Sequence, residues 1–140
     1  MQLEDGYLVV LSRDQAKVFF GQREDQPRLA FLQELLASSD TCRLCLDGRW
    51  QALHDALSAL AIEDSLLSQC ILGGRPLHQG NDYHVCLVRP DVVRFIADQA
   101  HQIDESSVEA SQLDLCQAVL GIYKEAAELA GAMVFVAKKI

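Results

Sequence analysis

The segment around which this chain is organised begins with Leu46-Asp47-Gly48-Arg49-Trp50-Gln51-Ala52-Leu53-His54 and extends to Gly80. Trp50 is the only tryptophan in the chain, and an aromatic side chain of this size tends to anchor a core. Large side chains continue at the spacing of one helix face, at Trp50, Leu53, His54, Leu57 and Leu60. The sequence therefore predicts a core helix that starts near Trp50 and is capped by Asp47.

Three short runs of β-forming residues predict strands near residues 7–11, 83–88 and 132–137. The segment 41–46 is either a brief strand or an extended lead into the Trp50 helix. Further helices are predicted after a capping box formed by Ser12 and Gln15, after Pro27, over Leu66–Leu72, after Pro90 and over Val108–Ala130. Strands separated by helices of unequal length predict an α+β fold. We expect a single domain over residues 1–140, with a small mixed or antiparallel sheet packed with about five helices.

The composition favours a globular protein without a membrane segment. Half of the residues are apolar, and 140 residues correspond to one domain. The longest apolar runs, such as 7–11 and 132–137, are far shorter than the roughly 20 residues that cross a bilayer. The first residues are acidic, whereas a signal peptide begins with basic residues. We therefore expect a cytoplasmic protein.

The formal charge of −8 is concentrated in one segment. Between Asp91 and Glu128, eight carboxylates are opposed only by Arg94 and Lys124, which leaves a charge of −6. Such a field repels nucleic acid and anionic membranes and favours a basic protein partner. The alternative interpretation is a solvated helix surface that keeps the protein soluble. The candidate partner-binding residues are Asp91, Asp98, Asp104, Glu105 and Glu109.

The two cysteines of Cys42-Arg43-Leu44-Cys45 have the spacing of half a zinc knuckle or of a thiol–disulfide pair. A structural zinc site needs four ligands, and the other cysteines and histidines are scattered singly along the sequence. A redox cysteine usually begins a helix that follows a strand, whereas this pair precedes the predicted helix by several residues. We therefore expect reduced thiols that act as small apolar side chains, with no metal ion and no cofactor.

A second candidate site is a pocket built from Trp50, His54, Arg75 and Tyr83. His54 is either a structural group that binds a buried carbonyl, which is the commoner role beside a core tryptophan, or a general base. A base needs a partner that orients it, and the sequence identifies none. The glycines at 73 and 74 before Arg75 do not match a phosphate loop or a dinucleotide-binding motif. The sequence therefore predicts no catalytic residue, and whether the protein is an enzyme stays open.

Several motifs resemble those of the YfbM-like family of small bacterial proteins of unknown function (domain of unknown function family 1877). They are Leu46-Asp47 before Trp50 and Leu53-His54, then Ile71-Leu72-Gly73-Gly74, Pro90 with Val93, and Tyr123-Lys124-Glu125-Ala126-Ala127 before Gly131. The resemblance covers roughly residues 7–136. It departs from the family at 103–115, a shortened segment before the last helix that lacks a Tyr-Pro motif, and at Cys42 and Cys45. The resemblance implies an α+β fold and no specific activity.

The leading hypothesis is a non-catalytic cytoplasmic protein-binding module, of the kind represented by immunity or antitoxin proteins. Its partner would be a basic protein, for example a toxin domain. The alternative is a small-molecule-binding protein or small enzyme that uses the pocket around Trp50, His54 and Arg75. A third interpretation is a housekeeping domain whose role is mainly oligomeric.

Overall fold

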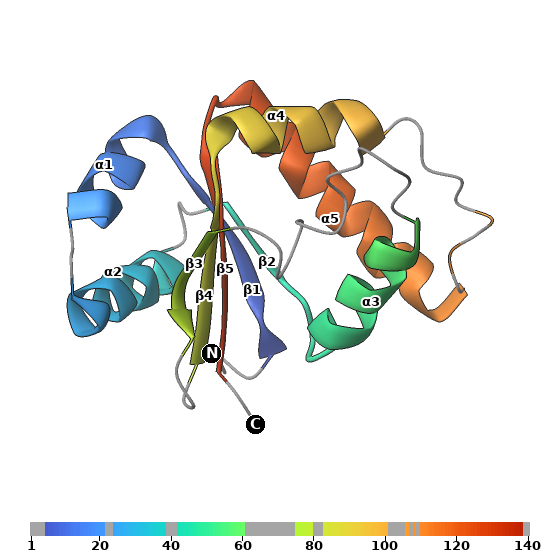
Figure 1. Cartoon of the computed structure of the whole chain (residues 1–140), viewed down its shortest axis with the longest axis horizontal. Coiled ribbons are helices and arrows are strands. Elements are labelled where there is room, and N and C mark those ends of the chain that lie inside the picture. Colours follow the sequence, from blue (N-terminus) through green and yellow to red (C-terminus); the bar gives the residue numbers. More distant parts are fainter. Residues whose placement is uncertain are drawn as a thin grey trace.

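A computed structural model provides the structure of the chain (Figure 1). It describes residues 5–21, 24–38, 42–60, 75–79, 83–100, 106, 108 and 110–138. Within these residues the chain forms three layers, in which a five-stranded sheet lies between helices on both of its faces (Figure 1).

The elements follow one another as β1 (Tyr7–Leu11), α1 (Arg13–Gly21), α2 (Asp25–Ala37), β2 (Arg43–Cys45), α3 (Trp50–Leu60), β3 (Arg75–Gln79), β4 (Tyr83–Val88), α4 (Pro90–Gln99), α5 (Ala110–Glu128) and β5 (Ala132–Lys138). The predicted α+β fold is confirmed. The strands β1 and β4 have the predicted bounds, and β5 is one residue longer than expected. The strands β2 and β3 complete the sheet at its two edges.

The sheet has the strand order β2-β1-β5-β4-β3, and every pair of neighbouring strands is antiparallel. The C-terminal strand β5 occupies the centre, where Val134 is paired with Val9 of β1 and with Leu87 of β4. A central strand is covered by helices on both faces, and this explains why every residue of β1 and all residues of β5 from Ala132 to Ala137 are buried.

Side chains of adjacent strand residues point to opposite faces of the sheet, so the strands divide the core into two clusters. On one face, Val9 and Val134 pack with Phe19 of α1 and Leu32 of α2. On the other face, α3, α4 and α5 pack on the strands, with cluster members that include Leu8, Leu53, Ile96, Tyr123 and Phe135. We call these the α1–α2 cluster and the α3–α5 cluster.

The local helix signals were predicted correctly at two places. Gln15 donates its backbone N–H to Ser12 Oγ at 3.2 Å, and Ser12 donates its own to Gln15 Oε1 at 3.0 Å, which is the expected capping box. In α4, Pro90 occupies the first turn. The apolar spacing after it predicts that Val92, Val93, Ile96 and Ala97 face the core; the last three are buried, and Val92 is half-buried against the same core. Both signals are local in sequence, which is why they could be predicted without tertiary information.

The prediction that Asp47 caps α3 is wrong. Asp47 and Gly48 have φ angles of +52° and +74°, and Arg49 donates its N–H to the Leu46 carbonyl at 2.9 Å. This is a two-residue turn with left-handed backbone at both central positions, for which Asp-Gly is a favoured sequence. The first helical hydrogen bond of α3 runs from the Leu53 N–H to the Arg49 carbonyl, so Arg49 is the boundary residue.

The sequence predicts a loop over Leu77–Asp82, and its first part is corrected, because residues up to Gln79 belong to β3, which pairs with β4. This strand contains Pro76 and shows no alternation of apolar and polar residues, and its register shifts between Pro76 and His78. Proline and irregular pairing are tolerated at a sheet edge, which is where β3 lies. The helix predicted over Leu66–Leu72 lies outside the described residues. No helix in the described ranges combines the length and apolarity of a membrane-spanning segment.

Candidate functional site

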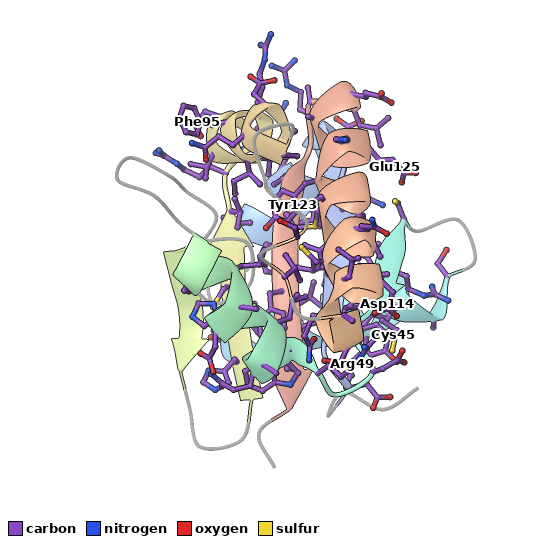
Figure 2. The ribbon with its side chains drawn as sticks, turned by 90° about the vertical axis from the view of Figure 1, so that its right-hand side faces the viewer. Cys45, Arg49, Phe95, Asp114, Tyr123 and Glu125 are labelled. Carbon is purple, nitrogen blue, oxygen red and sulfur yellow. The ribbon has the colours of Figure 1, made fainter. Side chains whose placement is uncertain are left out.

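The acidic segment forms an exposed surface wherever the structure describes it. Asp91 and Asp98 lie on α4, and Asp114, Glu125 and Glu128 lie on α5; all five side chains are exposed. The remaining predicted partner-binding residues, Asp104, Glu105 and Glu109, lie outside the described residues. The two helices pack side by side on one face of the sheet, as both views show (Figures 1 and 2).

On α4 the acidic residues are balanced by arginines. Arg89 Nη2 lies 3.1 Å from Asp91 Oδ2, and both side chains are largely exposed. Arg94 is exposed on the same helix, beside Asp98. The four ionisable residues from 89 to 98 therefore sum to zero charge, because Arg89, which lies just before α4, offsets the excess carboxylate of the helix.

Asp114 of α5 is held by an arginine from another element. Arg49 donates from Nη1 and Nη2 to the two carboxylate oxygens at 3.4 and 3.2 Å, and also from Nη1 to the Ser111 carbonyl at 2.8 Å (Figure 2). The hydrogen bond from Arg49 is the main cause that lowers the pKa of Asp114, and a backbone hydrogen bond at Leu115 adds to it. This pair fixes the start of α5 against the turn that precedes α3.

Glu125 accepts a hydrogen bond from a cysteine thiol. Cys42 Sγ lies 3.1 Å from Glu125 Oε2. Burial of the thiol, and then the hydrogen bond and charge of Glu125, raise the pKa of Cys42 to about 11. A thiol with this pKa stays protonated at neutral pH and is a poor nucleophile. The contact therefore orients the Glu125 side chain and does not activate Cys42 as a nucleophile.

Cys42 and Cys45 lie on opposite faces of the sheet. Cys42 packs against the α3–α5 cluster, whereas Cys45 packs against the α1–α2 cluster, and its Sγ lies 3.4 Å from Asp47 Oδ1. Their spacing of three positions in extended chain explains this placement. The two thiols therefore do not form a metal-binding or disulfide pair in this arrangement. In the described ranges, no group of three or more His, Cys, Asp or Glu side chains is arranged to hold a metal ion.

The outward face of α5 carries two small residues between carboxylates. The residues at positions 114, 118, 121, 125 and 128 follow helical spacing and are all exposed. A Cβ atom added at Gly121 would meet no heavy atom within 4 Å, so the space above this glycine is open. We call Asp114, Ala118, Gly121, Glu125 and Glu128 the α5 stripe. The helical spacing of these small and acidic residues is visible in the sequence alone.

The alternative pocket begins with Trp50, which lies at the margin of the α3–α5 cluster and is half-buried. Its ring centroid is 5.4 Å from that of Phe135 and 6.0 Å from that of His84, which it meets edge-on. Gly6 lies under the indole, because a Cβ there would come within 2.7 Å of Trp50 Cδ1. His84 was not predicted from the sequence, since only the pairing of β4 with β5 brings it to Trp50.

Of the other pocket residues, Arg75 and Tyr83 are placed by their backbone only. His54 follows Trp50 by one turn of α3 and is half-buried. Arg75 is paired with Leu87, and Tyr83 with Lys138. Tyr83 and Leu87, the partner of Arg75, are four residues apart on β4, which corresponds to about 13 Å along the strand. Arg75 and Tyr83 thus lie at opposite ends of the β3–β4 hairpin, and a pocket that joins them stays a prediction.

Comparison with known proteins identifies the family to which the chain belongs. The sequence profile of a family described as Domain of unknown function (DUF1877) matches residues 6–129. The chain belongs to this family. The prediction from the sequence motifs is thereby confirmed. No curated protein sequence matches the chain.

The fold of this DUF1877 protein is similar to that of YfbM, a protein of unknown function from Escherichia coli whose crystal structure is known. The TM-score is 0.68 and the sequence identity is 14%, over 94% of this chain and 98% of that one. The similarity establishes the fold and describes no activity.

Several of the described residues that carry the resemblance to DUF1877 lie in the core. Leu46, Leu53 and Val93 are fully buried in the α3–α5 cluster. Trp50 packs against the same cluster. These motif residues therefore contribute to the core of this chain, and the exposed α5 stripe lies outside the motif except for Glu125.

Proposed function

We propose that this DUF1877 protein is a non-catalytic cytoplasmic binding module that sequesters a basic protein partner, as immunity proteins of bacterial toxin systems do. One observation carries the proposal: all five described carboxylates between Asp91 and Glu128 are exposed to solvent. Carboxylates that attract a partner must be exposed before it arrives, and a core role would have buried some of them.

Within this acidic surface we place the contact on the α5 stripe. On α4, Asp91 and Asp98 are offset by Arg94 and by Arg89, which lies just before the helix. On α5, Glu125 and Glu128 are opposed only by Lys124. The open space above Gly121 allows a partner's backbone or flat side chain to approach the helix closely. Glu125 is already oriented by Cys42, so less conformational entropy is lost when it binds a cation.

The net charge of −8 also supports this proposal through the kinetics of association. A negative field increases the rate at which a basic protein arrives, and the effect weakens as salt shortens the Debye length from about 10 Å at 0.1 M to about 3 Å at 1 M. The same field disfavours nucleic acid and anionic membranes as partners.

The experiment compares two variants that remove the same charge from opposite faces of the sheet. Glu125→Gln/Glu128→Gln changes the α5 stripe. Asp14→Asn/Glu34→Gln removes two exposed carboxylates from α1 and α2 and is the matched control. The wild type is used to recover a partner by pull-down from its source cells, and the product of the neighbouring gene is tested directly. Association rates are then measured by stopped flow at several salt concentrations.

We expect the α5 variant to associate at least about tenfold more slowly than the control at low salt, with the difference shrinking at high salt. Equal rates for both variants would show that the α5 stripe takes no part in binding. An association rate between the wild type and its partner that does not change with salt concentration would contradict the electrostatic basis of the proposal.

A further inference from the structure

The outward face of α4 combines an exposed aromatic ring with charges of both signs. Phe95 is 44% exposed, which is unusual for so large an apolar side chain on a helix whose other face packs into the core. With 3.6 residues per turn, positions 91, 94, 95 and 98 lie on one stripe. All four side chains, those of Asp91, Arg94, Phe95 and Asp98, are exposed.

Two of the three charges on this face, those of Arg94 and Asp98, are available to pair with another molecule. Asp91 is already paired with Arg89. In the described part of the chain, neither Arg94 nor Asp98 forms an ion pair. Phe95 therefore lies between a cation and an anion that are four residues apart, and the local charge sums to zero.

We propose that α4 is the interface of a homodimer, in which it packs antiparallel against α4 of a second copy. A two-fold axis at the level of residue 96 places Arg94 of each copy opposite Asp98 of the other. The same axis brings the two Phe95 rings within two residues of one another along the helices, about 3 Å of rise. A face is suitable for a two-fold contact when it is complementary to itself, and this spacing of cation, ring and anion satisfies that condition.

A second copy fits this face better than a basic partner does. A strongly basic surface would meet Arg94 as well as the salt-bridged pair of Arg89 and Asp91, so it would gain little from Asp98 alone. A copy of α4 satisfies Arg94 and Asp98 together and buries both Phe95 rings. A pair of ten-residue helices buries less area than a permanent dimer needs, so we infer a dimer that dissociates on dilution.

The test is sedimentation equilibrium at physiological salt, over roughly 10 µM to 1 mM protein, the range in which small interfaces associate. The weight-average mass of the wild type should rise with concentration from 15.5 kDa towards twice that value. Phe95→Ser should remain at 15.5 kDa. Val18→Ser is the matched control, because Val18 is 51% exposed on α1, on the other face of the sheet, and this variant should associate as the wild type does.

A charge exchange tests the register. Arg94→Asp places anions at both 94 and 98, and Asp98→Arg places cations at both, so each variant alone should lose at least about tenfold in association. Mixed in equal amounts, the two variants should associate again, because each charge then faces its opposite in both contacts. Adding Phe95→Ser to both should abolish the mixed species. Circular dichroism verifies that each variant remains folded.

A wild-type mass that stays at 15.5 kDa over the whole range would overturn the proposal, as would association that Phe95→Ser leaves unchanged. Failure of the mixed variants to associate would exclude the antiparallel register. The inference does not depend on the proposed function, because Glu125→Gln/Glu128→Gln should leave self-association unchanged and Phe95→Ser should leave the α5 stripe intact.

Discussion

Arg49 and Asp114 are 65 positions apart in the sequence, and two hydrogen bonds of 3.4 and 3.2 Å join them at the surface (Figure 2). Arg49 is the boundary residue of α3, and Asp114 lies in the second turn of α5. Because Nη1 also binds the Ser111 carbonyl, one guanidinium connects the turn after β2 with the start of α5. The contact places α3 beside α5 and fixes one end of the α5 stripe.

The first prediction concerns the titration of Asp114. Its pKa is lowered chiefly by Arg49, so the pair stabilises the fold above the ordinary aspartate value of 3.8 and loses that contribution as the pH falls through the lower folded value. Arg49→Gln should raise the pKa of Asp114 towards 3.8, as measured by carbon-detected NMR of the side-chain carboxyl. Arg43→Gln is the control, because the Arg43 guanidinium binds the Ser38 carbonyl and not Asp114. An unchanged pKa in Arg49→Gln would mean that the pair is not formed in solution.

The second prediction concerns the contact of Trp50 with Gly6. Trp50→Ala should cost about 2–3 kcal/mol, less than a fully buried tryptophan, because the indole is half-buried. Gly6→Ala should cost a similar amount, since Gly6 has φ +76° and its new Cβ would meet Trp50 Cδ1 at 2.7 Å. In the Trp50→Ala background, Gly6→Ala should cost only the strain of a positive φ, about 1–2 kcal/mol. Urea unfolding of the four proteins measures this coupling; strictly additive effects would argue against the contact.

The third prediction concerns the thiol of Cys42. With a pKa of about 11 in place of 9.0, its thiolate fraction at pH 8 is about a hundredfold lower than that of an ordinary thiol. Alkylation by iodoacetamide, followed by mass spectrometry of Cys42, should therefore be slow at pH 8 and accelerate up to pH 11. Glu125→Gln should lower the pKa only in part, because burial is the larger cause.

The same raised pKa has a consequence for stability. The folded state keeps the Cys42 proton above pH 9, where the unfolded chain releases it, so this group should reduce the free energy of unfolding as the pH rises from 9 to about 11. Cys42→Ala should weaken that pH dependence, as urea unfolding at each pH would show. An equally steep loss of stability in the variant would assign the effect to other groups.

The fourth prediction contrasts two glycines. Gly121 lies in α5 with open space around its missing Cβ, so Gly121→Ala should stabilise the protein by about 0.5–1 kcal/mol. Gly131 is buried, and a Cβ there would lie 2.5 Å from the Leu11 carbonyl oxygen, which is a rigid backbone atom. Gly131→Ala should cost about 1–3 kcal/mol, because β1 or the end of α5 has to move. Thermal unfolding of both variants measures the difference, and an effect of the same sign in both would contradict this assignment.

The sequence by itself determined the elements whose signals are local. The run Tyr7–Leu11 is a strand because it is uniformly β-forming, and Ser12 with Gln15 begins α1 because each side chain satisfies the other's backbone N–H. Pro90 and the apolar spacing after it defined the inward face of α4. The family resemblance was also readable from local motifs, some of whose residues, such as Leu46 and Leu53, pack in the core.

Only the tertiary structure decided which distant residues meet. The short edge strands β2 and β3 have weak local signals and exist because β1 and β4 pair with them. Cys42 and Cys45 form a motif in the sequence, but extended backbone directs them to opposite faces of the sheet. Arg49 contacts Asp114, Cys42 contacts Glu125, and His84 contacts Trp50, although each pair is far apart in the sequence. Such contacts depend on the register and order of the strands, and the C-terminal β5 fixes that order by pairing with both β1 and β4 at the centre of the sheet.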